Sequence, residues 1–149
     1  MTSGSGASQR RIVVGVDGSP PSRAALRWAV GQAALTGAVV DAVTAWRLPA
    51  GYEWAPDATG IADFEAEARK NLAEAVSEAT REAGDTGSAV DVRPQVVWGH
   101  PAQVLIEAAR GAELLVVGSR GRGGFAGALL GSVSQYCVHH APCPVLVIR

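Results

Sequence analysis

The stretch LLVVGSRGRGGFAGALLGS, residues 114–132, carries the strongest signal for the fold. Its first four residues form an apolar run typical of a buried parallel strand, and from Ser132 onward the apolar spacing becomes helical. Six glycines join the two patterns, at positions 118, 121, 123, 124, 127 and 131. A strand joined to a helix through glycine-rich backbone predicts a loop that cradles a phosphate, because the N–H groups at a helix start are unpaired and carry partial positive charge. We expect Ser132 to cap that helix, and we expect the glycines to permit close backbone approach and positive φ angles.

The charge distribution agrees with an anion site in this part of the chain. All 14 acidic residues lie at or before Glu113, whereas Arg120 and Arg122 lie within the glycine-rich segment. A phosphate bound there would meet no acidic side chain from the loop or from the residues that follow it. The formal net charge of −1 gives no reason to expect a nucleic-acid partner, which usually requires a basic domain.

Outward from this stretch, apolar runs alternate with amphipathic segments along the chain. We expect strands at residues 12–16, 39–46, 89–98, 114–118 and 145–148, and helices at residues 20–36, 61–83, 102–110 and 132–140. This alternation predicts an α/β fold, a single doubly wound domain with a five-stranded parallel sheet and four helices. Arg93 and Pro94 place the third strand at an edge of the sheet.

The remaining segments set the boundaries of the predicted domain. Residues 1–9 are rich in Ser and Gly and are expected to be a disordered leader before a domain at 10–149, and residues 47–60 are expected to form an irregular loop that could cover the site. Cys137 and Cys143 match no redox or metal-binding spacing, and no apolar stretch reaches the roughly 18 residues of a membrane span. We expect a cytoplasmic protein with no membrane partner and no metal site built from side chains.

The ends of the first and fourth predicted strands mark the candidate site. In doubly wound sheets, ligands bind beyond the carboxyl ends of the strands where the strand order reverses. Asp17 and Gly118 follow these two strands, so they are expected on opposite walls of one crevice. Asp17 alone fits a simple turn before Gly18 equally well. Trp46 and Trp54 are the aromatic residues that we expect nearest to this crevice.

Three better-known nucleotide or phosphate signatures are excluded by the residues present. A Walker loop needs a lysine, and the only lysine, Lys70, falls in a predicted helix. The spacing Gly121-x-Gly123-x-x-Ala126 fits a dinucleotide fingerprint, but the acid required about 20 residues later does not exist after Glu113. A response-regulator receiver would need clustered acids and a lysine after the last strand, and both are missing.

These residues together resemble the universal stress protein family, specifically its ATP-binding branch, from about Arg11 to Arg149. The family signature G-x-x-G-x9-G-[ST] is matched without a gap by Gly118, Gly121, Gly131 and Ser132. The sequences IVVGVDGS at 12–19 and PVLVI at 144–148 match as well, and so does the Gly99-x-Pro101 turn. The resemblance assigns residues 10–149 to a universal stress protein domain.

The resemblance implies a site that binds ATP together with Mg²⁺. The implied nucleoside contacts are Gly15, Val16, Asp17, Ala45, Val117 and Gly118. The implied phosphate contacts are Arg120, Gly121, Gly131, Ser132, Val133 and Ser134. Thr44 and Arg120 occupy positions where histidine is frequent in the family, so the chain departs from the common pattern there.

The expected function is that of an ATP-binding universal stress protein, a nucleotide-responsive regulatory or interaction module in the stress response. It is not expected to be an enzyme, although slow ATP hydrolysis is compatible with it. The short apolar strand at 145–148 would leave a sheet edge exposed, which together with the resemblance predicts a homodimer through that strand. Two alternatives remain: a structural or interaction dimer that binds no nucleotide, and a nucleotide-hydrolysing or adenylating enzyme. The choice among ATP, ADP, AMP and a cyclic nucleotide stays open, as do the protein partner and the type of stress.

Overall fold

A computed structural model describes residues 9–48, 58–120 and 130–149. Its elements follow one another in the order β1 (Arg11–Gly15), α1 (Pro20–Thr36), β2 (Val39–Trp46), α2 (Ala58–Glu82), α3 (Gly84–Ser88), β3 (Val92–Trp98), α4 (Pro101–Ala108), β4 (Leu114–Gly118), α5 (Ser132–His140) and β5 (Val145–Ile148). Of the described helices, none is long and apolar enough to cross a membrane.

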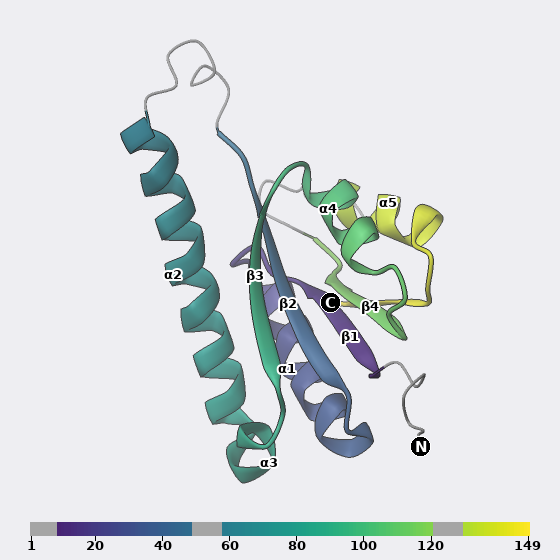
Figure 1. Cartoon of the computed structure of the whole chain (residues 1–149). Helices are drawn as coiled ribbons and strands as arrows, with labels where there is room; N and C mark the ends of the chain where they lie inside the picture. The colour runs from purple at the N-terminus through teal and green to yellow at the C-terminus, as the bar shows by residue number, and fades with distance from the viewer. Residues whose placement is uncertain (1–8, 49–57, 121–129) are drawn as a thin grey trace, which may run out of the picture.

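The five strands form one parallel sheet in the order β3-β2-β1-β4-β5, which confirms the predicted sheet (Figure 1). The chain begins at the central strand, builds outward to β3, and then crosses to the other side of β1 to build β4 and β5. The third strand lies at an edge, as Arg93 and Pro94 predict, and β5 lies at the other edge. The strand order therefore reverses between β1 and β4.

Helices cover both faces of the sheet, because each central strand is apolar on both sides. On one face, Val14 of β1 packs in a core with Leu26 of α1 and Leu72 of α2. On the other face, Val13 packs in a second core with Leu105 of α4 and Cys137 of α5. The predicted inner face of α1, which contains Leu26, Ala29, Val30 and Ala33, is buried.

The helix count differs from the prediction, because α3 is a fifth, short helix in the described part of the chain. The sequence predicts a single helix in this region, at residues 61–83. Instead, α2 ends at Glu82, Gly84 turns the chain with a φ of 67°, and Gly87 lies inside the extra turn. A Cβ atom at Gly87 would lie 2.6 Å from the carbonyl oxygen of Thr80, so the glycine permits a close approach that a larger residue would prevent.

Several element boundaries also shift. Helix α2 begins at Ala58, so residues 58–60 of the predicted irregular loop are helical, and β3 begins at Val92 instead of 89. Residues 49–57 of that loop, with its predicted covering role, lie outside the described residues, as do residues 1–8 of the predicted leader. Gln9 is described, and its side-chain oxygen accepts a hydrogen bond from Arg93 at 3.3 Å.

An ion pair between the buried Asp41 and the partly buried Arg11 ties the two central strands to α4. Asp41 of β2 is only 4% exposed, and its carboxylate lies 2.7 Å from Nη1 of Arg11 on β1. The same guanidinium donates to the carbonyl oxygens of Ala108, at 3.3 Å, and Arg110, at 2.6 Å, at the end of α4. Because burying a carboxylate without a partner is costly, Arg11 satisfies a charge that the sheet would otherwise exclude.

The buried thiol of Cys137 is expected to lower the stability of the fold at alkaline pH. Its side chain is fully buried, and this burial raises the pKa of the Cys137 thiol to about 11. An exposed thiol ionises near pH 8.5, so between these values the unfolded chain releases a proton that the folded chain keeps. Stability is therefore lost as the pH rises from about 9 toward 11.

We expect Cys137→Ala to reduce this loss of stability at alkaline pH. The quantity to measure is the change in free energy of urea unfolding between neutral pH and about pH 10, compared between the variant and the wild type. The absolute stability of the variant is not the test, since the smaller side chain also changes packing. An equal change in both proteins would contradict the assignment.

Candidate functional site

The candidate site lies where β1 and β4 run side by side and end together. Val14 of β1 is in register with Val116 of β4, so both strands point their carboxyl ends to the same edge of the sheet. Beyond that edge the chain leaves β1 for α1 on one face, and it leaves β4 for α5 on the other face (Figure 1). Connections that diverge in this way leave a crevice between two adjacent strand ends, which is where open α/β sheets bind ligands.

On the β1 side of the crevice, a hydrogen-bonded turn holds Asp17. Its Oδ1 accepts from the backbone N–H of Ser19 at 2.9 Å and from the Ser19 hydroxyl at 2.5 Å. The Ser19 oxygen in turn accepts from the N–H of Ser22 at 3.4 Å, so Ser19 is the N-cap of α1. Asp17 is exposed, and Ser19 is only 7% exposed. The exposed carboxylate is thus supported by a buried hydroxyl.

The two walls of the crevice meet at Ser19. Its hydroxyl oxygen lies 3.4 Å from the carbonyl oxygen of Arg120, which follows β4. The structure therefore brings Asp17 and the residues after Gly118 to the same place, as their positions at the strand ends predict. The side chain of Arg120 is half-buried there.

On the β4 side, the base of the glycine-rich loop is closed by hydrogen bonds. The carbonyl oxygen of Ser119 accepts from the N–H of Gly131 at 2.6 Å and from the hydroxyl of Ser134 at 3.0 Å. The Ser134 hydroxyl also lies 3.0 Å from the carbonyl oxygen of Gly131, and Ser134 is only 2% exposed. This residue, assigned to phosphate by resemblance, has its hydroxyl occupied at the base of the loop. Gly121 and the rest of the loop through residue 129 lie outside the described residues.

Two expectations about this loop are wrong. Neither Gly118 nor Gly131 has a positive φ: Gly131 has a φ of −73°, and the positive-φ glycines in the described ranges are all elsewhere. The N-cap of α5 is Gly131, and Ser132 is the first helical residue, so Ser132 is not the capping serine. Gly118 is required for space, because a Cβ atom there would lie 2.8 Å from backbone atoms of Pro21 and Ser22.

The nucleoside side of the predicted site is mostly backbone. The Val16 N–H donates to Val43 at 2.9 Å, and the Val16 carbonyl accepts from the Thr44 hydroxyl at 2.8 Å. The side chains of Val16 and Val117 are buried in opposite cores. Gly15 ends β1 with a Cβ position only 2.7 Å from Leu105 Cδ1.

Ala45 and Val133, the other predicted contacts, are half-buried at the end of β2 and in the first turn of α5. Trp46 packs its ring against Trp98 at 4.7 Å between ring centroids, in an edge-to-face pair, while Trp54 lies outside the described residues. His100 has a structural role, since its Nδ1 accepts from the N–H of Ala102 and caps α4. Sequence reasoning missed Ser19 at the site, and it placed Ser134 there through the resemblance, as a phosphate contact and not as a support of the loop. The run Asp17-Gly18-Ser19, an acid followed two residues later by a hydroxyl, was a signal for such a turn.

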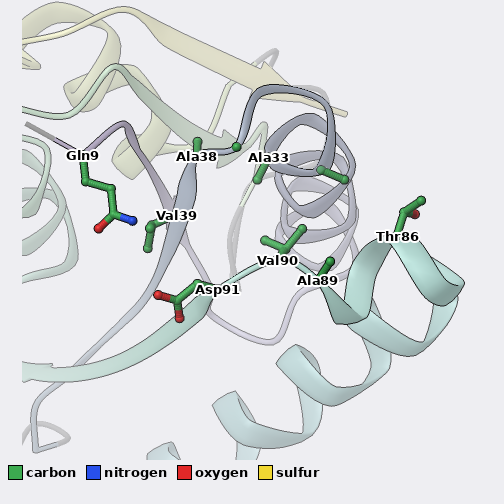
Figure 2. A pocket seen from close by; sticks show the side chains of 10 residues that line it. Gln9, Ala33, Ala38, Val39, Thr86, Ala89, Val90 and Asp91 are labelled. Carbon is green, nitrogen blue, oxygen red and sulfur yellow. The ribbon is translucent and has the colours of Figure 1, made fainter. Parts of the chain in front are cut away.

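A separate cavity lies at the opposite, amino end of the sheet (Figure 2). It has a volume of about 290 Å³, and its lining includes Val39 at the start of β2 and Val90 and Asp91 before β3. None of the predicted nucleotide contacts lines it. Within the described residues, no group of three or more His, Cys, Asp or Glu side chains is placed to hold a metal ion.

Comparison with known proteins finds universal stress proteins among the relatives of this chain. Universal stress protein Rv2005c of Mycobacterium tuberculosis is 39% identical over 147 residues, which are 95% of this chain and 48% of that protein. Universal stress protein Rv1996 of the same species is 39% identical over 143 residues, 93% of this chain and 43% of the other. The chain therefore spans about half the length of the curated relatives it matches.

Solved structures agree with this. A universal stress protein in complex with cAMP is 32% identical, with a TM-score of 0.64 over 94% of this chain and 97% of the other. UspA from Lactobacillus plantarum, at 23% identity, has the same fold, with a TM-score of 0.68 over 95% and 99% of the two chains. The model of the universal stress protein family matches residues 9–149. The chain belongs to the universal stress protein family.

Proposed function

We propose that this domain binds an adenine nucleotide, ATP with Mg²⁺, in the crevice between the ends of β1 and β4. The observation that carries the proposal is the start of α5. Ser19 and His100 each accept a hydrogen bond from one N–H group in the first turn of α1 and of α4, whereas among the described residues no side chain caps α5. An uncapped helix start beside a glycine-rich loop suits a phosphate. The similar protein solved with cAMP supports an adenine nucleotide as the ligand.

The phosphates are assigned to the start of α5 and to the two ends of the loop. In this proposal Gly131, Ser132 and Val133 offer backbone N–H groups, Arg120 offers a cation, and Gly121 completes the cradle. Ser134 contributes by holding the loop base, because its hydroxyl already contacts the Ser119 and Gly131 carbonyls. The assignment of Ser134 is therefore changed from a phosphate contact to a support of the loop.

The nucleoside is assigned to the β1 wall. Asp17 offers a carboxylate that is exposed and held in a fixed turn, and it can accept from a ribose hydroxyl or an amino group. Gly15, Val16, Val117 and Gly118 lie at the strand ends beneath it, where backbone and small atoms allow close approach. Ala45 extends the same wall at the end of β2.

The residues present fit a Mg²⁺ ion that arrives with the nucleotide. Mg²⁺ is usually held by one or two carboxylates together with substrate phosphates and water, and Asp17 is the one acid among the residues assigned to the site. The ion would neutralise phosphate charge, and Asp17 would orient its bound water.

We assign the domain a regulatory or interaction role in the stress response, in the cytoplasm, and not a catalytic one. Fast phosphoryl transfer needs a positioned base or several acids that hold metal at the phosphates; Asp17 is the single acid assigned to this site, and the sequence after Glu113 contains no acid or lysine. Turnover of ATP well below about 1 per second is expected. A faster rate in a steady-state phosphate-release assay would favour the hydrolysing or adenylating enzyme instead.

The free edge of β5 is proposed as the contact between two copies of the chain. All four residues of β5 are apolar and half-buried, while the other edge strand carries Arg93 and Pro94, which oppose strand addition. A two-fold pairing of β5 with its copy would close this edge. Sedimentation velocity at micromolar concentration is expected to show dimers, and a monomer at these concentrations would contradict the pairing.

Reversing the charge of Arg120 is expected to weaken Mg²⁺-ATP binding at least about tenfold, because a phosphate contact is replaced by repulsion. Arg120→Glu is compared with Arg110→Glu, which makes the same change in net charge after α4, at the amino end of the sheet. Isothermal titration of both variants measures the effect. Equal affinity for the two variants would contradict the placement of the phosphates beside Arg120.

A further inference from the structure

We infer that Ser19 is a positioning residue for the nucleotide site: its hydroxyl donates to the Asp17 carboxylate and holds it in the orientation that binds nucleotide, while its oxygen packs against the opposite wall of the crevice. The inference rests on the proposed function, and it adds a residue to which neither the motif nor the resemblance assigns a role at the site.

The geometry of the Asp17 turn carries the first step. One carboxylate oxygen, Oδ1, receives both the N–H and the hydroxyl of Ser19, at 2.9 Å and 2.5 Å. Hydrogen bonds to an ionised carboxylate are stronger than hydrogen bonds between neutral groups. The nearly complete burial of Ser19 also shields its two hydrogen bonds to Asp17 from water. Two donors on one oxygen fix its position and so restrict both side-chain torsions of Asp17, χ1 and χ2, and the exposed acid keeps one orientation toward the crevice.

Helix capping alone does not explain this arrangement. A capping serine needs only its oxygen, which accepts from the Ser22 N–H at 3.4 Å. The hydroxyl proton is additional to that role, and it is directed at Asp17. By contrast, His100 caps α4 through Nδ1 from an exposed position, so capping in this protein does not require a link to an acid.

The same hydroxyl oxygen of Ser19 also contacts the second wall of the crevice, on the β4 side. Ser19 Oγ lies 3.4 Å from the Arg120 carbonyl, at the start of the glycine-rich loop. The hydroxyl has a single proton and two acceptors within reach, and the carboxylate is the closer one. The side chain therefore fixes Asp17 while it packs against the chain that leads to the phosphate-binding segment.

The test is a double-mutant cycle on Mg²⁺-ATP affinity. Ser19→Gly removes the hydroxyl but keeps most of the capping stability, because glycine is nearly as good an N-cap as serine. In the wild-type background we expect it to weaken affinity about tenfold, and in an Asp17→Ala background less than about twofold. His100→Gly, which alters a cap at another helix, is the matched control and should bind like the wild type.

Two outcomes of the cycle overturn the inference. In the first, Ser19→Gly binds Mg²⁺-ATP as tightly as the wild type. In the second, Ser19→Gly reduces the affinity by the same factor in the wild-type background and in the Asp17→Ala background. A second measurement does not need nucleotide. Three-bond couplings to the carboxyl carbon of Asp17 report its χ1 angle, and we expect a single rotamer in the wild type and averaging in Ser19→Gly. The same couplings in both proteins would overturn the positioning role. A wild-type protein that binds no nucleotide would refute the proposed function, and the couplings would then decide on Ser19.

Discussion

Arg11→Met is expected to lower the free energy of unfolding by about 3–5 kcal/mol. The cause is the Asp41 carboxylate, which is 4% exposed and 2.7 Å from the guanidinium that the variant removes. Methionine fills part of the space but cannot pair with the charge, and the carbonyls of Ala108 and Arg110 lose their donor as well. Urea unfolding at neutral pH, followed by circular dichroism, measures the loss.

The double variant Arg11→Met, Asp41→Leu is the control for this explanation. If the cost of the single variant comes from a buried, unpaired charge, replacing both partners with apolar residues should recover most of the stability. A double variant as unstable as the single one would show that the loss comes from packing around Arg11 and not from Asp41.

Gly118→Ala is expected to destabilise the fold by about 3 kcal/mol, a large effect for one added methyl group. The new Cβ would lie 2.8 Å from backbone atoms of Pro21 and Ser22 in the first turn of α1. A clash with backbone cannot be relieved by a rotamer change, so α1 or β4 must move. Thermal and urea unfolding measure the effect.

Gly31→Ala is the matched control on α1. Among the described residues, no atom beyond the chain neighbours and the adjacent backbone of the helix lies within 4 Å of the Cβ position of Gly31, so this change should be neutral or stabilise the helix by up to about 1 kcal/mol. If Gly118→Ala is as stable as the wild type, the close approach of α1 to β4 is wrong. Because the expected loss is structural, weakened nucleotide binding by Gly118 variants would not by itself locate the ligand. Arg120 is the more informative position for that purpose.

The architecture could be predicted from the sequence because each element is consistent with its neighbours. The apolar run at 114–117 has the length of a buried strand, and Ser19 followed by Pro20 marks the start of α1. Arg93 and Pro94 identify an edge strand because a charge and a missing N–H are tolerated there. Short-range rules failed at Gly84 and Gly87, where glycine permits a tight helical turn as easily as it ends a helix.

The location of the candidate site could be predicted from the sequence, but the contacts of its supporting residues could not. Strand ends and topology locate Asp17 and Gly118. The contact of Ser19 with the Arg120 carbonyl joins residues 101 apart, and the contact of Ser134 with the Ser119 carbonyl joins residues 15 apart, so neither follows from local sequence. The Arg11–Asp41 pair joins residues 30 apart in the same way. Asp41 was nevertheless a signal, because one acid inside the apolar run at 39–43 requires a partner if that strand is buried.

The most direct measurement of the central claim is isothermal titration of the wild-type chain with ATP in the presence of Mg²⁺, after a denatured sample has been checked for copurified nucleotide. We predict binding of a single nucleotide per chain with a dissociation constant in the micromolar range, about −8 kcal/mol. The absence of both binding heat and copurified nucleotide would contradict the account. It would leave a universal stress protein domain that acts through protein contacts alone.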